Sequence, residues 1–181
     1  MMILILGGSG CGKSAYAEKR IMKLAAGKET VYYLATMQVF GEEGRKKVAR
    51  HIELRKDKGM LTIEQTRDVR DAIPQMEPGP RAVLLEDLGN LVANEMFTET
   101  ESFDADFVTT KVCEHIGLLN ESVEHLVIVS NNVFEDGITY EEGTQRYVTA
   151  LGRIHAELAR LSDEVVEVVV GIPCHVKGGE Q

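Results

Sequence analysis

The chain has 181 residues and a mass of 20.0 kDa, which is enough for one domain with a hydrophobic core. Its formal net charge is −9, from 20 Lys and Arg against 29 Asp and Glu, and this balance disfavours nucleic acid as a partner. Its apolar runs are too short to cross a membrane, and three widely spaced cysteines predict neither a disulfide framework nor a C-x-x-C metal site, so we expect a cytoplasmic protein.

Five short apolar runs predict buried β-strands. Each is rich in Val, Ile, Leu or Tyr, and each is continuous rather than alternating, which is typical of a parallel sheet covered on both faces. The predicted strands are Ile3–Leu6, Val31–Ala35, Ala82–Glu86, Leu126–Ser130 and Val165–Val170.

Helical patterns separate these strands. They cover Lys13–Ala26, Glu42–Lys58, Asp104–Glu124 and Glu141–Leu161, and the last of these has an amphipathic stripe. The segment Ile73–Pro80 holds three of the four prolines and is predicted to be a loop. Strands that alternate with helices predict an α/β doubly wound fold, and the absence of a linker or repeat predicts one domain over residues 1–181.

The strongest motif directly follows the first predicted strand. Gly7-Gly8-Ser9-Gly10-Cys11-Gly12-Lys13-Ser14 matches the P-loop pattern G-x-x-x-x-G-K-[ST] at every fixed position. Glycines let backbone N–H groups wrap a phosphate chain, and the following helix points its N-terminus at the anion. Lys13 is then expected to reach the β- and γ-phosphates, and Ser14 to supply a hydroxyl to Mg²⁺. The motif predicts binding of GTP or ATP.

A second acidic group is expected beside the P-loop, to hold Mg²⁺ directly or through water. The predicted strand Ala82–Glu86 ends in two carboxylates, Glu86 and Asp87. Ligands of open α/β sheets bind at the carboxyl ends of strands, so both residues are well placed. We predict Glu86 as the metal residue, in preference to Asp87.

His51 lies among basic residues on a predicted helix, on the same face as Arg55 and close to Arg50. A histidine in such surroundings can attack an α-phosphate while the arginines offset the developing charge. From the residues alone, an exposed helical histidine without a catalytic role is the better interpretation of His51. The other histidines read as surface or structural residues.

These motifs, taken in order, resemble the adenosylcobinamide kinase/adenosylcobinamide-phosphate guanylyltransferase family of cobalamin biosynthesis. The resemblance runs from Met2 to about Lys177, and beyond the P-loop it depends on the order and spacing of short segments. These segments are Tyr33-Leu34-Ala35-Thr36, Lys47-Val48-Ala49-Arg50-His51 with Arg55, Leu84-Leu85-Glu86, Val129-Ser130-Asn131 and Gly171-Ile172-Pro173.

The resemblance implies two linked reactions. ATP or GTP would phosphorylate the aminopropanol hydroxyl of adenosylcobinamide, and GMP would then pass from GTP to that phosphate through a guanylylated histidine, His51 by position. It also implies a RecA-like fold of the P-loop NTPase class, Mg²⁺, a corrinoid substrate and a homotrimer.

The chain departs from the family pattern mainly in its second half. Gly10-Cys11 replaces the usual Arg-Ser of the P-loop, Asn132 replaces a Glu, and Thr139-Tyr140 and His155-Ala156 replace Val-Pro and Asn-Gln. Two other functions therefore stay open. One is a P-loop kinase of another small molecule, which would not need His51, and the other is a GTP-binding relative without catalytic activity.

Overall fold

A computed structural model describes residues 1–38, 58–98, 100–134 and 140–179. Its centre is a seven-stranded sheet with the order β3-β2-β4-β5-β1-β6-β7. All neighbours in the sheet are parallel except β6 and β7, which are antiparallel. The strands are β1 (Met2–Gly7), β2 (Thr30–Ala35), β3 (Met60–Glu64), β4 (Arg81–Glu86), β5 (His125–Asn131), β6 (Glu164–Val169) and β7 (Ile172–Lys177).

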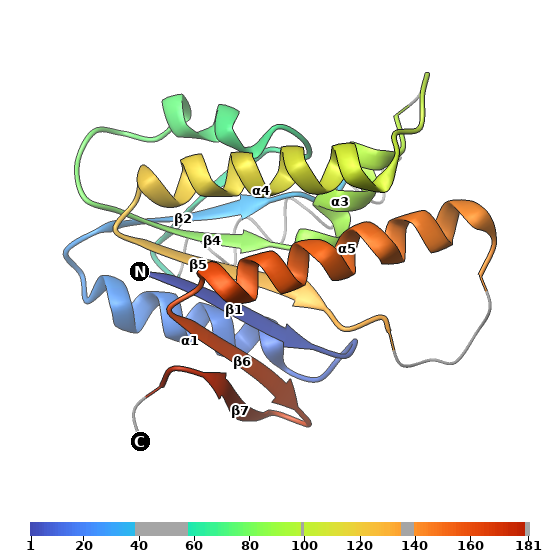
Figure 1. The fold of residues 1–181 in the computed structure, drawn as a ribbon. Coiled ribbons are helices and arrows are strands. Elements are labelled where there is room, and N and C mark those ends of the chain that lie inside the picture. Colours follow the sequence, from blue (N-terminus) through green and yellow to red (C-terminus); the bar gives the residue numbers. More distant parts are fainter. Residues whose placement is uncertain (39–57, 99, 135–139, 180–181) are drawn as a thin grey trace, which may run out of the picture.

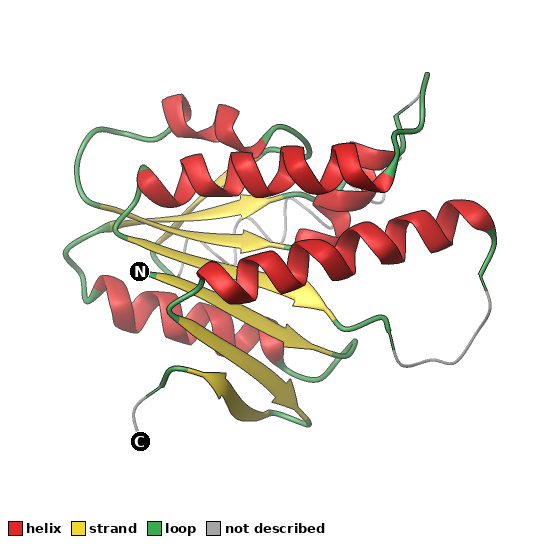
Figure 2. Ribbon diagram, in the orientation of Figure 1, coloured by secondary structure: helices red, strands yellow, loops and turns green. Residues whose placement is uncertain are grey.

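Helices cover both faces of this sheet (Figure 1). One face carries α3 (Leu88–Met96), α4 (Ala105–Glu121), α5 (Glu142–Leu161) and the 3₁₀-helix η1 (Val69–Gln75), and α1 (Lys13–Ala25) packs on the other face. Figure 2 shows that the arrowheads of β1, β5 and β6 point to the same edge of the sheet. This is the α/β architecture with helices on both faces that the sequence predicts.

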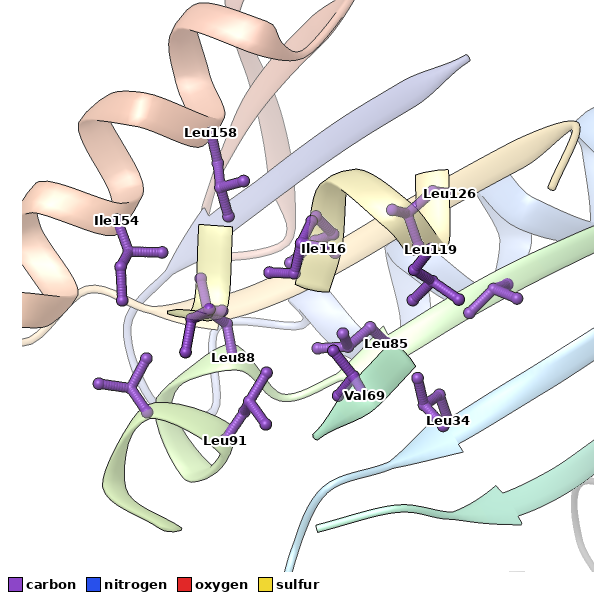
Figure 3. Packing of buried hydrophobic residues seen from close by; sticks show 14 of the residues in the cluster. Leu34, Val69, Leu85, Leu88, Leu91, Ile116, Leu119, Leu126, Ile154 and Leu158 are labelled. Atoms are coloured by element: carbon purple, nitrogen blue, oxygen red, sulfur yellow. The ribbon is translucent and has the colours of Figure 1, made fainter. Parts of the chain in front are cut away.

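The continuous apolar runs arise because each central strand is buried on both faces. Leu85 faces the core under α3, α4 and α5, whereas its neighbour Leu84 faces the core under α1. Figure 3 shows the first of these cores, where Leu85 lies among side chains from the helices, including Leu88 and Ile116. A strand with two buried faces has no polar side to alternate with.

The five predicted strands are confirmed, but two edge strands were missed. β3 buries Met60 and Ile63 and exposes Leu61, so it lacks a continuous apolar run. β7 is exposed at every residue and contains Pro173, which an edge strand tolerates because one of its sides has no partner. Neither strand needs the apolar composition by which the central strands were recognised.

The segment Ile73–Pro80 was predicted as a loop, and this is wrong for Ile73–Gln75, the end of η1. The helix contains Pro74, but Val69 and Ala72 pack into the core and stabilise it through burial rather than propensity.

The helix α3 was not predicted from the sequence. The predicted helix Glu42–Lys58 lies almost wholly outside the described residues. No helix in the described part of the chain has the length and apolar character to cross a membrane.

Candidate functional site

The chemistry-bearing residues meet at the carboxyl edge of the parallel strands. The P-loop follows β1, Glu86 ends β4 and Asp87 comes directly after it, and Asn131 ends β5. In the register of the sheet Gly7 pairs with Asn131, and Glu86 pairs with Val129 of the same β5 strand. Parallel pairing therefore brings together segments that are more than a hundred residues apart in the chain, which is the usual ligand position in an open α/β sheet.

The P-loop depends on its glycines. Gly10 and Gly12 have φ values of 72° and 94°, which side chains rarely adopt. A Cβ on Gly7 would lie 2.7 Å from the Val168 carbonyl oxygen and 2.6 Å from Cys11 Sγ, so the loop and β6 could not approach as they do. The turn after β6 also supports the loop, because the Gly171 N–H donates to the Cys11 carbonyl at 2.8 Å.

Lys13 is the first residue of α1 and is only 7% exposed. Its Nζ donates to the Gly8 carbonyl oxygen at 3.0 Å, so the ammonium group lies over the loop. Gly12, the N-cap of α1, provides no side-chain cap, which leaves backbone N–H groups at this helix end for an anion. A buried ammonium and a helix N-terminus together form a strong phosphate cradle.

Ser14 and Glu86 lie side by side, with Ser14 Oγ donating to Glu86 Oε1 at 2.5 Å. A hydroxyl and a carboxylate oxygen are both hard ligands of the kind that Mg²⁺ takes beside substrate phosphates. The pair therefore fits a magnesium ion at the P-loop, and these are the two residues that the sequence predicts for this task.

Asp87 has a different role from Glu86. Its carboxylate caps α3 by accepting from the Asn90 N–H at 2.6 Å, and it accepts from Asn131 Nδ2 at 3.2 Å. Burial raises the pKa of Asp87, although the hydrogen bond from Asn90 and the charge of Lys13 oppose that shift. Burial, together with the charge of Asp87, also raises the pKa of the neighbouring Tyr147 to about 12. Asp87 therefore holds the start of α3 and the end of β5 together at the edge of the site.

A cleft of about 620 Å³ opens beside the P-loop, on the side of β6. Its described lining combines two P-loop residues, the segments that follow β5, and the end of β6. These residues are Gly8, Cys11, Asn132, Val133, Tyr140, Glu167, Val168, Val169 and Val170. A smaller cavity of about 200 Å³ adjoins it and is lined by Ser9, Asp87 and Asn131, among others. The larger cleft has the usual size of a small-molecule site.

His155 is 8% exposed and its Nε2 lies 2.7 Å from Ser130 Oγ, near the end of β5. Burial lowers the pKa of His155 from the usual 6.5 to about 4, so the ring is neutral at physiological pH. Because the unfolded chain takes up this proton at higher pH than the folded protein, protonation favours unfolding between the two pKa values.

We predict that lowering the pH from 7 to 5 costs the protein about 2 kcal/mol of unfolding free energy through His155. Urea unfolding at several pH values measures this cost, and His155→Gln is the matched variant because Gln keeps a hydrogen-bonding group beside Ser130. In the variant, the unfolding free energy should no longer fall by this amount between pH 7 and 5. An identical pH profile for both proteins would contradict a buried neutral His155.

The structure brings together the predicted P-loop residues and Glu86, whereas His51, Arg50 and Arg55 lie outside the described residues. Sequence reasoning missed four polar residues of this edge. They are Thr36, Asn94, Asn131 and Glu167. Thr36 Oγ1 donates to the Asp87 carbonyl at 2.7 Å, and Asn94 Nδ2 donates to the Thr36 carbonyl at 2.8 Å. Thr36 and Asn131 directly follow predicted strands and belong to the short segments that carry the family resemblance, but neither was assigned to the site.

Comparisons with known proteins show the family to which this sequence is similar. Residues 3–176 match the model of the family described as cobinamide kinase / cobinamide phosphate guanyltransferase. The chain is 29% identical to the bifunctional adenosylcobalamin biosynthesis protein CobU of Salmonella typhimurium and 28% identical to the protein of that name from Escherichia coli. Each alignment covers 98% of this chain and 100% of the relative.

Among solved structures, the chain resembles the flagellar accessory protein FlaH from Methanocaldococcus jannaschii with a TM-score of 0.51. The sequence identity is 10%, and the match covers 99% of this chain and 81% of the other. This likeness concerns the fold alone. Together with the strand order and the P-loop, it confirms the expected RecA-like fold of the P-loop NTPase class.

Proposed function

The chain belongs to the cobinamide kinase / cobinamide phosphate guanyltransferase family, and we propose that it carries out both reactions in cobalamin biosynthesis. It would phosphorylate adenosylcobinamide and then transfer GMP from GTP to adenosylcobinamide phosphate. The observation that supports this proposal most is the P-loop, with Lys13 over the loop and Ser14 in contact with Glu86. Both curated relatives carry a bifunctional name, and they align over their whole length.

In the kinase reaction, the P-loop N–H groups and Lys13 hold the phosphates of ATP or GTP and offset their charge. Ser14 and Glu86 would hold Mg²⁺, which neutralises phosphate charge when it is bound. The hydroxyl oxygen of the corrinoid side chain attacks the γ-phosphorus and releases its proton to solvent, the bond to the β-phosphate oxygen breaks, and the nucleoside diphosphate leaves. This chain therefore contributes positioning and electrostatics to the reaction.

In the guanylyltransferase reaction, a ring nitrogen of His51 attacks the α-phosphorus of GTP, and pyrophosphate leaves. A phosphate oxygen of the corrinoid then displaces His51 and restores the free imidazole. A covalent intermediate divides one difficult transfer into two easier ones. We propose that Arg55, and with it Arg50, offsets the charge that develops at phosphorus.

The proposal is tested by incubating the protein with Mg²⁺, GTP and adenosylcobinamide and weighing the corrinoid products by mass spectrometry. We expect first the phosphate ester and then its GMP conjugate. Phosphate ester without conjugate would contradict the transferase reaction and leave a kinase. Unchanged corrinoid despite measured GTP binding would indicate a kinase of another small molecule or a binding protein. Adenosylcobinamide phosphate as the starting acceptor isolates the second reaction.

We also propose that the protein is a homotrimer and acts in the cytoplasm. Its three cysteines are free, which is compatible with a reducing compartment. Light scattering at several concentrations should return three times the chain mass of 20.0 kDa, and a steady 20.0 kDa would contradict the trimer.

A further inference from the structure

The cleft of about 620 Å³ is continuous with the P-loop, because Gly8 and Cys11 belong to its lining. A nucleotide whose phosphates lie on the loop can therefore place its nucleoside in this cleft, because the cleft opens directly onto the loop. The walls include Val133 and Val169, which provide apolar surface for a flat ring, whereas the Val168 side chain is buried in the core under α1. Apolar walls with few polar groups are typical of small-molecule sites.

Glu167 is the only carboxylate in the described lining of this cleft. It is half-buried on β6, where its backbone pairs with Leu6, just before the P-loop. Asn132 Nδ2 donates to Glu167 Oε1 at 3.4 Å, and Asn132 Oδ1 accepts from the Phe134 N–H at the same distance. These contacts position one carboxylate oxygen and use only part of its capacity to accept hydrogen bonds.

We propose that Glu167 reads the base of the bound nucleotide and selects guanine. The inference rests on the proposed function, because it assigns a base to the same nucleotide site. Guanine carries two neighbouring donors on one edge, the N1–H and the exocyclic N2 amino group. A carboxylate accepts both with its two oxygens, and hydrogen bonds to a charged partner are the strong ones. The described residues thus contain a guanine-reading group outside any Asn-Lys-x-Asp motif.

Adenine does not match this carboxylate. Its N1 is an acceptor and its C2 carries no amino group, so a lone pair would face the negative oxygens. A site that is built to bond a donor rejects the analogue without it, because its own polar group is then left unpaired. A phosphate group in this cleft would be repelled by Glu167, so the phosphates belong on the loop and the base beside β6.

The test is the affinity of the purified protein for three nucleoside triphosphates, GTP, ATP and xanthosine triphosphate, measured by equilibrium titration with Mg²⁺. Xanthine has an oxygen where guanine has the N2 amino group. Glu167→Gln replaces one acceptor oxygen by an amide donor of nearly the same shape. We expect this variant to bind GTP about 10- to 100-fold more weakly and to gain a comparable factor for xanthosine triphosphate. Its affinity for ATP should change little.

Glu121→Gln is the matched control. Glu121 is exposed at the end of α4, at the opposite edge of the sheet, and should leave all three affinities unchanged. GTP and xanthosine triphosphate affinities that do not move in Glu167→Gln would overturn the assignment while leaving the proposed function intact. A weaker affinity for all three nucleotides would also overturn it, since an equal loss for every base would mean that the substitution had disturbed the phosphate-binding P-loop. Absence of binding of any nucleotide by the unmodified protein would instead contradict the proposed function.

Discussion

Replacing Lys13 by Met should lower kcat/KM for phosphoryl transfer by about a thousandfold, which is the loss expected when one preorganised charge donor is removed from a transition state. Lys13 is almost fully buried, and its ammonium group lies over the loop, on the Gly8 carbonyl oxygen. Methionine keeps much of the length and the apolar stem of the side chain but cannot offset phosphate charge. The loop should therefore fold normally and bind phosphates poorly.

Steady-state kinetics with GTP and adenosylcobinamide measures this effect, and thermal unfolding checks that the variant is folded. Lys19→Met is the matched control, because Lys19 lies six residues along the same helix and is exposed. The control should retain its kcat/KM. A Lys13→Met protein that keeps more than about a tenth of the activity would contradict the role given to this ammonium group.

Glu86→Gln should lower kcat by roughly 10- to 100-fold and raise the Mg²⁺ concentration needed for half-maximal rate. Ser14 donates to the carboxylate that this substitution removes, so the group proposed to hold the ion loses its charge. GTP binding measured with EDTA present should change much less than turnover, because the loop N–H groups and Lys13 are unaltered.

Glu64→Gln provides the comparison for Glu86. Glu64 also ends a parallel strand at this edge, but it is exposed and belongs to β3, two places along the sheet from β4. Its kcat and magnesium requirement should equal those of the unmodified protein. Equal magnesium titrations for Glu86→Gln and Glu64→Gln would remove Glu86 from the metal site.

The fold was predictable where strands are buried on both faces. Runs such as Ala82–Glu86 carry a strong signal because neither side of a central strand can be polar. The apolar composition does not identify β7, because this edge strand is exposed at every residue and need not be apolar. The strand order was beyond sequence reasoning as well, because central strands of similar composition can exchange places without changing the pattern.

The P-loop and Glu86 were predictable because their chemistry requires fixed residue types at fixed spacing. Asp87 and Asn131 contact each other only because β4 and β5 are neighbours in the sheet. Glu167 gave no signal for the same reason, since it looks like one polar residue in an apolar strand until β6 is placed beside the P-loop. Residues that act through their tertiary neighbours can be recognised only once the strand order is known, and the composition of the strands does not predict that order.

The structure shows which residue Asn132 contacts, at a position where the chain departs from the family pattern. Where the family pattern has a Glu, this chain has an amide whose Nδ2 contacts the Glu167 carboxylate. The negative group beside this amide in the cleft belongs to β6. The departure at His155 is likewise accommodated, because the buried ring pairs with Ser130 and meets Phe134 edge-on.

The most direct test of the proposed bifunctional activity is covalent labelling with GTP that carries radioactive phosphorus at the α-position. The protein is incubated with labelled GTP and Mg²⁺, denatured and tested for retained label. A phosphoramidate predicts label that acid releases and alkali does not, full labelling in the control His125→Ala, and no labelling in His51→Ala. Undiminished labelling in His51→Ala would contradict the assigned nucleophile, and absence of label in the unmodified protein, with GTP binding intact, would contradict the guanylyltransferase reaction itself.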